Sequence, residues 1–150
     1  MNIRRALPEE AGQLSALAML AKAHWSYSAA QLDAWRGSLC VAPSEIAAQP
    51  CFVCEDGEGV RGFYLLHTDG PWRLEHLWVH PDAMRRGIGR ALVLHAMAQA
   101  QAGGQDALLV ESDPNAEAFY LSCGATRTHL AAAPIAGQPG RQLPHMRLPL

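Results

Sequence analysis

The sequence predicts a mixed α/β fold in which helices flank one central, mostly antiparallel sheet. Two observations predict this fold class. Stretches of helical and strand-like periodicity follow one another in the order strand, two helices, three strands, helix, strand, helix and two strands. The composition is 49% hydrophobic and 17% charged, which is typical of chains that bury a core and excludes intrinsic disorder. A length of 150 residues predicts one domain over residues 1–150.

The first third of the chain predicts a strand and two helices. Residues 2–5 form a short strand pattern, and Pro8 with two following glutamates is typical of a helix start, because proline fits the first turn and carboxylates suit its positive end. Ser28 and Gln31 form a capping-box pattern for the second helix. One face of the first helix carries apolar residues at helical spacing, namely Leu14, Leu17, Ala18 and Ala21.

The middle of the chain predicts an antiparallel meander. Three strand patterns are separated by the turn signals Asp56-Gly57 and Asp69-Gly70-Pro71. These strand patterns cover residues 50–55, 60–68 and 73–79.

The last third predicts two helices around a short strand, and then a hairpin. A helix is expected from about residue 87 to residue 102, where Gly103-Gly104 ends it. Residues 107–111 form a short buried strand pattern. Asp113-Pro114 opens a further helix that ends at Gly124, and the remaining residues form two extended runs.

Charge and cysteine content argue against several classes of protein. Twelve basic and fourteen acidic residues give a net charge of -2, which disfavours a nucleic-acid partner. Cys51 and Cys54 form a lone C-x-x-C in a strand-like run, where residues three apart point to opposite faces. A zinc site needs four ligands, and no second pair exists. We therefore expect no metal site and free thiols.

Hydropathy predicts a protein without a membrane span, because no apolar run is long enough to cross a bilayer. Arg4, Arg5 and the apolar residues 14–21 imitate a signal peptide, but Pro8 and Glu9 are among the residues that interrupt it. An amphipathic helix explains this segment better. We expect a cytoplasmic location.

A candidate anion site follows the third strand of the meander. The first N–H groups of a helix have no internal partner and lie at the positive end of its dipole, and glycines let an anion approach them. This segment consists of Arg85, Arg86, Gly87, Ile88, Gly89 and Arg90. The pattern is typical of a pyrophosphate site. The alternative interpretation is an ordinary loop whose arginines are solvated. The segment does not match G-x-G-x-x-G, because residue 92 is leucine where that motif needs glycine. It does not match G-x-x-x-x-G-K-[ST], because the only lysine of the chain is Lys22.

Two segments resemble the GNAT superfamily of N-acetyltransferases. Leu77-Trp78-Val79 followed by residues 85–90 resembles its acetyl-CoA signature, and residues 113–125 (DPNAEAFYLSCGA) resemble its N-A-x-x-F-Y-x-x-x-G-F segment. The order of elements is also similar to that of the GNAT fold. The sequence departs from the family pattern at Met84, where arginine or glutamine is usual, and at Ala125, where phenylalanine is usual.

The resemblance implies acetyl-CoA as co-substrate and no metal. Main-chain groups of Leu77 to Val79, Trp78 included, would pair with the pantetheine arm as an added strand does. The amides of residues 85–90 would hold the pyrophosphate, and Asn115 would hydrogen-bond the pantetheine. Tyr120 would face the sulfur and donate a proton to the leaving thiolate. The alternative interpretation of Tyr120 is an aromatic residue of the core.

The amine must lose a proton to attack, and two carboxylates are candidate bases. Glu111 ends the strand that is expected beside the one carrying Glu75, and alternation places Glu75 on the face of Leu77 and Val79. Each has the alternative of a surface carboxylate paired with an arginine. His76 is expected on the other face of its strand.

The resemblance places His24, Trp25 and Tyr27 beside the acceptor pocket. These residues could shape a small apolar or cationic acceptor site, or they could pack the end of the first helix. The expected activity is transfer of acetyl to a primary amine of a small-molecule or protein acceptor by direct attack. A non-catalytic acyl-CoA sensor is the alternative, and a homodimer is one assembly that the sequence allows.

Overall fold

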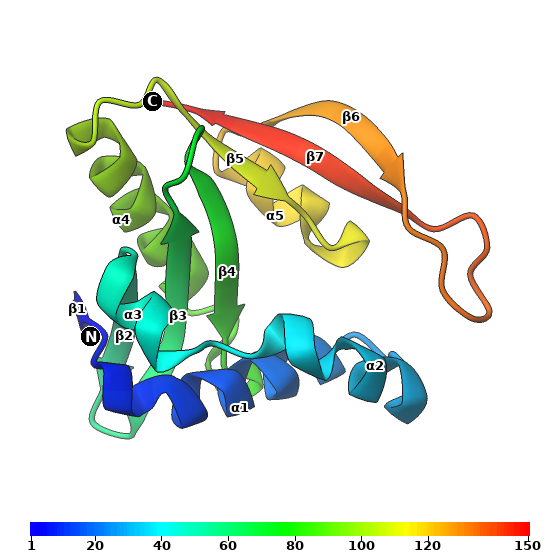
Figure 1. Cartoon of the computed structure of the whole chain (residues 1–150), viewed down its shortest axis with the longest axis horizontal. Helices are drawn as coiled ribbons and strands as arrows, with labels where there is room; N and C mark the ends of the chain where they lie inside the picture. Colours follow the sequence, from blue (N-terminus) through cyan, green and yellow to red (C-terminus); the bar gives the residue numbers. More distant parts are fainter.

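A computed structural model describes all 150 residues and shows a seven-stranded mixed sheet with the strand order β1-β2-β3-β4-β5-β7-β6 (Figure 1). Every neighbouring pair is antiparallel except β4 and β5. The strands are β1 (Asn2–Arg5), β2 (Cys51–Asp56), β3 (Gly59–His67), β4 (Arg73–Val79), β5 (Ala107–Glu111), β6 (Thr126–Ala132) and β7 (Gln142–Pro149). The helices are α1 (Ala11–Ala23), α2 (Ala29–Leu39), α3 (Pro43–Ala48), α4 (Ile88–Ala102) and α5 (Glu117–Ser122).

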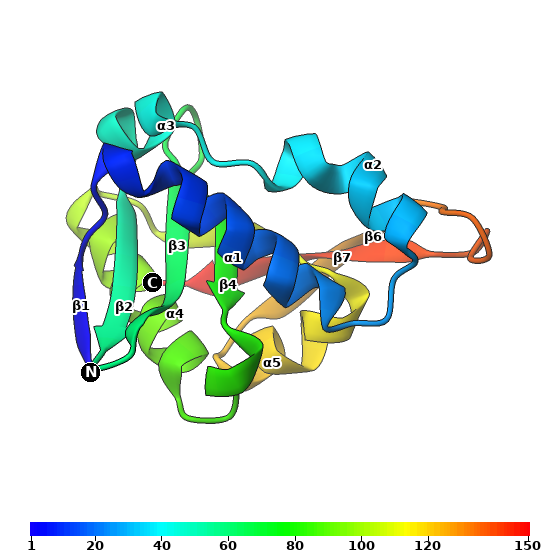
Figure 2. The same cartoon turned by 90° about the horizontal axis from the view of Figure 1, so that it is seen from below.

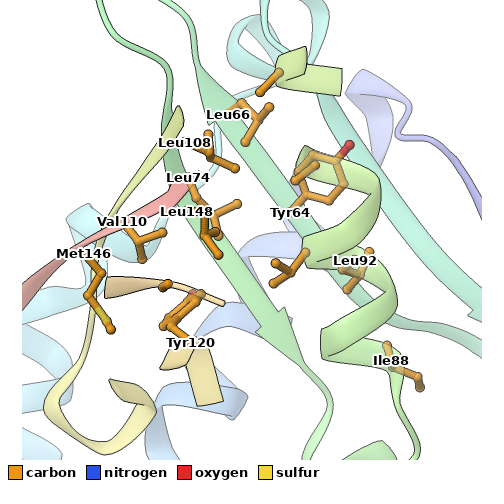
Figure 3. Packing of buried hydrophobic residues seen from close by; sticks show 14 of the residues in the cluster. Tyr64, Leu66, Leu74, Ile88, Leu92, Leu108, Val110, Tyr120, Met146 and Leu148 are labelled. Atoms are coloured by element: carbon orange, nitrogen blue, oxygen red, sulfur yellow. The ribbon is translucent and has the colours of Figure 1, made fainter. Parts of the chain in front are cut away.

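Helices cover both faces of the sheet, with α1, α2 and α3 on one face and α4 and α5 on the other (Figure 2). Each face buries its own cluster of apolar side chains. The cluster under α1 includes Leu14, Ile46 and Phe63. The cluster under α4 includes Leu92 and Tyr120. Figure 3 shows Leu92 near Tyr64 of β3, which belongs to the same cluster.

The predicted elements agree with the structure in type and order, with one addition. The short helix α3 was not expected, since its six residues carry only one buried side chain, Ile46. The segment at Pro8 begins as a 3-10 turn (Pro8–Glu10) before α1 starts. At the start of α2, the Ser28 side chain accepts a hydrogen bond from the Gln31 amide, as the capping pattern predicted. The expected apolar face of α1 is buried.

The two cysteines of the C-x-x-C pattern lie on opposite faces of β2. Cys51 is buried in the cluster under α1, and Cys54 is buried in the cluster under α4. Their thiols are free. The prediction from strand geometry is confirmed, and these two cysteines are core residues.

A β-bulge in β4 sets the direction of the side chains that follow it. Leu65 of β3 pairs with His76, and the next residue, Leu66, pairs with Leu74, so that Glu75 is an extra residue on β4. As a result Leu74 and Leu77, three residues apart, both pack against the cluster under α4. The bulge also contradicts the simple alternation that placed Glu75 on the face of Leu77.

β4 and β5 separate soon after they begin. Their ladder contains only two residue pairs, Arg73 with Leu109 and Leu74 with Val110. Beyond these pairs β5 turns away from β4 (Figure 1). The remaining β5-facing edge of β4 therefore has main-chain groups without a strand partner, and the sheet opens at this point.

None of the helices has the length and apolarity that crossing a membrane requires.

Candidate active site

A cavity of about 730 Å³ lies where β4 and β5 separate. The end of α1, α2, the whole of β4, the start of α4, the end of β5, α5 and the β6–β7 loop all contribute to its lining. Its walls combine aromatic side chains with charged ones of both signs, among them Trp25, Trp78, Arg85, Glu111 and Arg141. A concave site of this size, with convergent polar groups, is typical of small-molecule binding.

The loop of residues 85–90 presents free main-chain donors to the cavity. None of its six amides donates a hydrogen bond to another main-chain group, and the first main-chain bond of α4 runs from Ala91 N to Gly87 O at 3.0 Å. Gly87 is the N-cap of α4, with φ +81°, a conformation that glycine adopts without strain. Arg85 has φ +63°. Consecutive free amides at the start of a long helix are suited to a phosphate group.

The unpaired edge of β4 continues from this loop along the cavity. Leu77, Trp78 and Val79 all line the cavity, and β5 pairs with none of them. An extended ligand can therefore pair with this edge as an additional strand would. The loop and the edge together suit a ligand with a phosphate group at one end and amide groups along its arm.

Tyr120 of α5 combines burial with a free hydroxyl. Its ring packs edge-on against Phe119, with 5.1 Å between ring centroids, and Figure 3 shows it near Val110 and Met146. The residue lines the cavity, and its hydroxyl makes no hydrogen bond to another residue. Burial raises the pKa of Tyr120, with a smaller contribution from Cys123, so that the hydroxyl stays protonated at neutral pH. This hydroxyl is available as a proton donor.

The two candidate carboxylates lie at the cavity in different surroundings. Glu111 is exposed at the end of β5 and forms no ion pair. Glu75 is partly exposed, and its carboxylate lies 3.4 Å from His67 Nδ1 and 3.9 Å from Arg73 Nη2. His67 in turn lies 3.1 Å from Glu45 of α3, on the face opposite to Leu77. The bulge thus turns Glu75 towards His67.

A group of buried charges at one end of the cavity was missed by the sequence analysis. This group, the Lys22 cluster, consists of Lys22, Tyr27, Trp35, Asp113 and Arg141. Lys22 Nζ donates to Asp113 Oδ2 at 2.5 Å, and the Tyr27 hydroxyl donates to the same oxygen at 2.8 Å. Arg141 Nη2 donates to the Tyr27 hydroxyl at 3.3 Å.

The charges of the Lys22 cluster perturb one another. Burial lowers the pKa of Lys22, and its ion pair with Asp113 opposes that effect. Burial alone would raise the pKa of Asp113, but the hydrogen bond from Lys22 lowers it. One signal in the sequence pointed to this cluster. Leu14, Ala18 and Lys22 recur at intervals of four, which places the chain's only lysine on the buried face of α1.

The comparison with protein families decides the family. The family model described as an acetyltransferase (GNAT) domain matches residues 47–124, more than half of the chain. The chain belongs to the GNAT superfamily of N-acetyltransferases.

Solved structures of other proteins share the fold of this acetyltransferase. A GCN5-related N-acetyltransferase from Rhodopseudomonas palustris is 25% identical, with a TM-score of 0.82, and the match covers 99% of this chain and 95% of that one. The PaiA N-acetyltransferase from Thermoplasma acidophilum, solved in complex with coenzyme A, is 17% identical with a TM-score of 0.79, over 99% and 98% of the chains. No curated protein matches the chain by sequence.

The structure brings most of the predicted site residues of the acetyltransferase to one cavity. The residues that line it are His24, Trp25, Glu75, Leu77, Trp78, Val79, Arg85, Gly87, Gly89, Arg90, Glu111, Asn115 and Tyr120. Three predicted residues do not line it. Arg86 is exposed beside it, Ile88 is buried in the core under α4, and Tyr27 lies behind the cavity wall in the Lys22 cluster.

Two predicted binding residues are occupied by contacts within the chain. Asn115 Nδ2 donates to Asp113 Oδ1 at 2.9 Å and to the Tyr27 hydroxyl at 3.4 Å, which leaves its carbonyl oxygen free. The Tyr27 ring lies under Lys22 Nζ, 5.1 Å from its centroid, and under the Arg141 guanidinium at 5.6 Å. The chain's own cations therefore occupy the aromatic ring that was considered for a cationic acceptor.

Proposed function

We propose that the whole chain acts as one acetyltransferase domain that transfers acetyl from acetyl-CoA to a primary amine by direct attack. The observation that carries this proposal is the run of free amides at residues 85–90, continuous with the unpaired edge of β4. The loop would bind the pyrophosphate of coenzyme A. Leu77 and Val79 would pair with the amides of the pantetheine arm.

Tyr120 would act at the sulfur of the thioester. The amine nitrogen attacks the acetyl carbon, a C–N bond forms, and the C–S bond breaks with its electron pair on sulfur. The leaving thiolate takes a proton from the Tyr120 hydroxyl, which makes no hydrogen bond to another residue. Tyr120 then regains a proton, which the amine has released and which the base or water carries to it.

A carboxylate at the cavity would remove the proton of the amine, directly or through water. Glu111 is the stronger candidate, because it lines the cavity without an ion pair. The Glu75 carboxylate already lies next to the side chains of His67 and Arg73. It is therefore less free to take a proton from the amine. The acceptor would enter beside His24 and Trp25, which line the cavity near the end of α1.

Two measurements test this function. Calorimetry with acetyl-CoA should show binding, and a thiol-release assay with a panel of amines should show turnover that depends on the amine. Absence of acetyl-CoA binding would contradict the proposal. Binding without thiol release for every amine would instead support a sensor.

A further inference from the structure

The Lys22 cluster holds more positive than negative charge at the wall of the cavity. Lys22 and Arg141 are two cations whose side chains are 11% and 6% exposed, and Asp113 is the one carboxylate among them. Both oxygens of Asp113 are already used. Oδ2 accepts from Lys22 and Tyr27, while Oδ1 accepts from the main-chain and side-chain nitrogens of Asn115. One buried positive charge therefore lacks an anion that bonds to it directly.

Arg141 carries this excess charge. Its Nη1 donates to Ala133 O at 3.2 Å and its Nη2 donates to the Tyr27 hydroxyl at 3.3 Å, while Asp113 Oδ2 lies 3.8 Å from Nη2, beyond hydrogen-bond distance. Its Nε is buried and has no partner. A buried guanidinium with an unused donor is costly, and a bound anion removes that cost. Arginine also offers the paired N–H groups that match a carboxylate.

Arg141 lies at the acceptor end of the cavity and away from the phosphate loop. It lines the cavity together with Lys22, Trp25 and Leu143. Figures 1 and 2 place the β6–β7 loop, which carries Arg141, beside α2 and away from the start of α4. The phosphates of coenzyme A have their own donors at residues 85–90. An anion at Arg141 would therefore be separate from these phosphates.

We propose that Arg141 binds a carboxylate of the acceptor, so that the acceptor is a small amine of the amino-acid type. This inference rests on the proposed function, because it names the substrate class of the same site. The carboxylate lies at Arg141 and Lys22, and the amino group points towards the acetyl group near Tyr120. Since Trp35 already lies 4.6 Å from Lys22 Nζ and 5.1 Å from the Arg141 guanidinium, it holds both cations in place.

The test compares acids with their matched amides. N-acetyl derivatives of alanine, leucine, phenylalanine and glutamate resemble the reaction product, and their primary amides lack the α-carboxylate. Binding is measured by calorimetry and by tryptophan fluorescence, with and without coenzyme A. The acids should bind at least about 10-fold more tightly than the amides, the gain of one charge-assisted pair. Equal affinity of acids and amides, or no binding by any acid, would overturn the inference.

Variants locate the carboxylate. Arg141→Gln should abolish the preference for acids, and Arg141→Lys should retain part of it because the charge remains without the planar pair of donors. Arg36→Gln is the matched control, since Arg36 is exposed on α2 and its side chain pairs only with Asp33. A preference for acids that survives in Arg141→Gln would contradict the assignment. A loss of kcat alone in this variant would indicate an electrostatic role in the reaction instead.

The thiol-release assay separates this inference from the proposed function. Amino acids and their amides are compared as acceptors under the same conditions. If amides are acetylated as fast as amino acids, the proposed function stands and the carboxylate site is wrong. If the acids bind with the expected preference and no thiol is released with any amine, the carboxylate site stands and the catalytic function fails.

Discussion

Tyr120 shows how one side chain serves both the core and the cavity. Its ring belongs to the apolar cluster under α4, while its hydroxyl makes no hydrogen bond to another residue and the side chain lines the cavity. The two alternatives that the sequence left open, a core aromatic residue and a proton donor, are therefore compatible. Packing fixes the ring, and the fixed ring holds the hydroxyl in one place.

Removing the Tyr120 hydroxyl should lower turnover without affecting binding. Tyr120→Phe should reduce kcat about 100-fold, because general acid catalysis is typically worth that much, while the Kd for acetyl-CoA changes little. Because burial raises the pKa of Tyr120 above its ordinary value of 10.0, the wild-type enzyme should keep this donor protonated through pH 9. An unaltered kcat in the variant would remove Tyr120 from the mechanism.

Replacing each of the two carboxylates should have a different effect on the removal of the amine proton. Glu111→Gln should lower kcat/KM about 100-fold, because the variant lacks the carboxylate that removes the amine proton. Glu75→Gln serves as the comparison and should cost less than about 3-fold, since its carboxylate faces His67. The reverse order of effects would assign the base to Glu75.

At the scale of elements, the start of α4 determines where an anion can bind. Its free amides result from helix geometry, because the first residues of any helix lack an acceptor one turn earlier. A substitution at Gly89 would add bulk to this loop, but it would also press on α5. A Cβ at Gly89 would lie 3.2 Å from the Phe119 ring, so this ring would have to shift by a few tenths of an ångström to admit any side chain there.

Charge reversal at Arg85 tests the phosphate loop without this complication. Arg85 is exposed, lines the cavity and makes no hydrogen bond through its side chain. Arg85→Glu should raise the Kd for acetyl-CoA about 10-fold by calorimetry, because it replaces attraction to the phosphates by repulsion. Arg36→Glu makes the same change on α2 and should leave the Kd unaltered. Equal affinities in the two variants would place the phosphates elsewhere.

For the molecule as a whole, the sheet joins two separately packed cores and opens between β4 and β5. β4 contributes to both cores, since Leu74 belongs to the cluster under α4 and Trp78 packs against the cluster under α1. His76, between them, is buried, and its Nδ1 accepts a hydrogen bond from Trp78 Nε1 at 3.0 Å. Its expected orientation, away from the face of Leu77, is confirmed.

The burial of His76 should make folding sensitive to acid. Burial lowers its pKa below the ordinary value of 6.5, although Glu75 and Glu45 oppose the shift. The unfolded chain therefore binds this proton more readily, and the free energy of unfolding should fall as pH decreases below about 6.5 and be independent of His76 above it. Urea unfolding at pH 7.5 and pH 5.0 measures the loss, which should be smaller in His76→Gln. An equal loss in both proteins would contradict this role.

The order of the elements and the place of the loop of residues 85–90 were predictable from the sequence. Both depend on local chemistry, namely periodicity, turn residues such as Asp69-Gly70, and the glycine that begins α4. Strand alternation also predicted the opposite directions of Cys51 and Cys54 correctly. It failed at Glu75, because a bulge depends on how β3 and β4 pair.

The Lys22 cluster at one end of the cavity depends on contacts between distant segments. Lys22, Asp113 and Arg141 come from α1, the segment after β5 and the loop before β7, and no local pattern links them. They meet because β5 turns away from β4 and the C-terminal hairpin lies beside α2 (Figure 1). Such contacts arise from the packing of distant segments. The excess positive charge of the Lys22 cluster exists only in the folded chain.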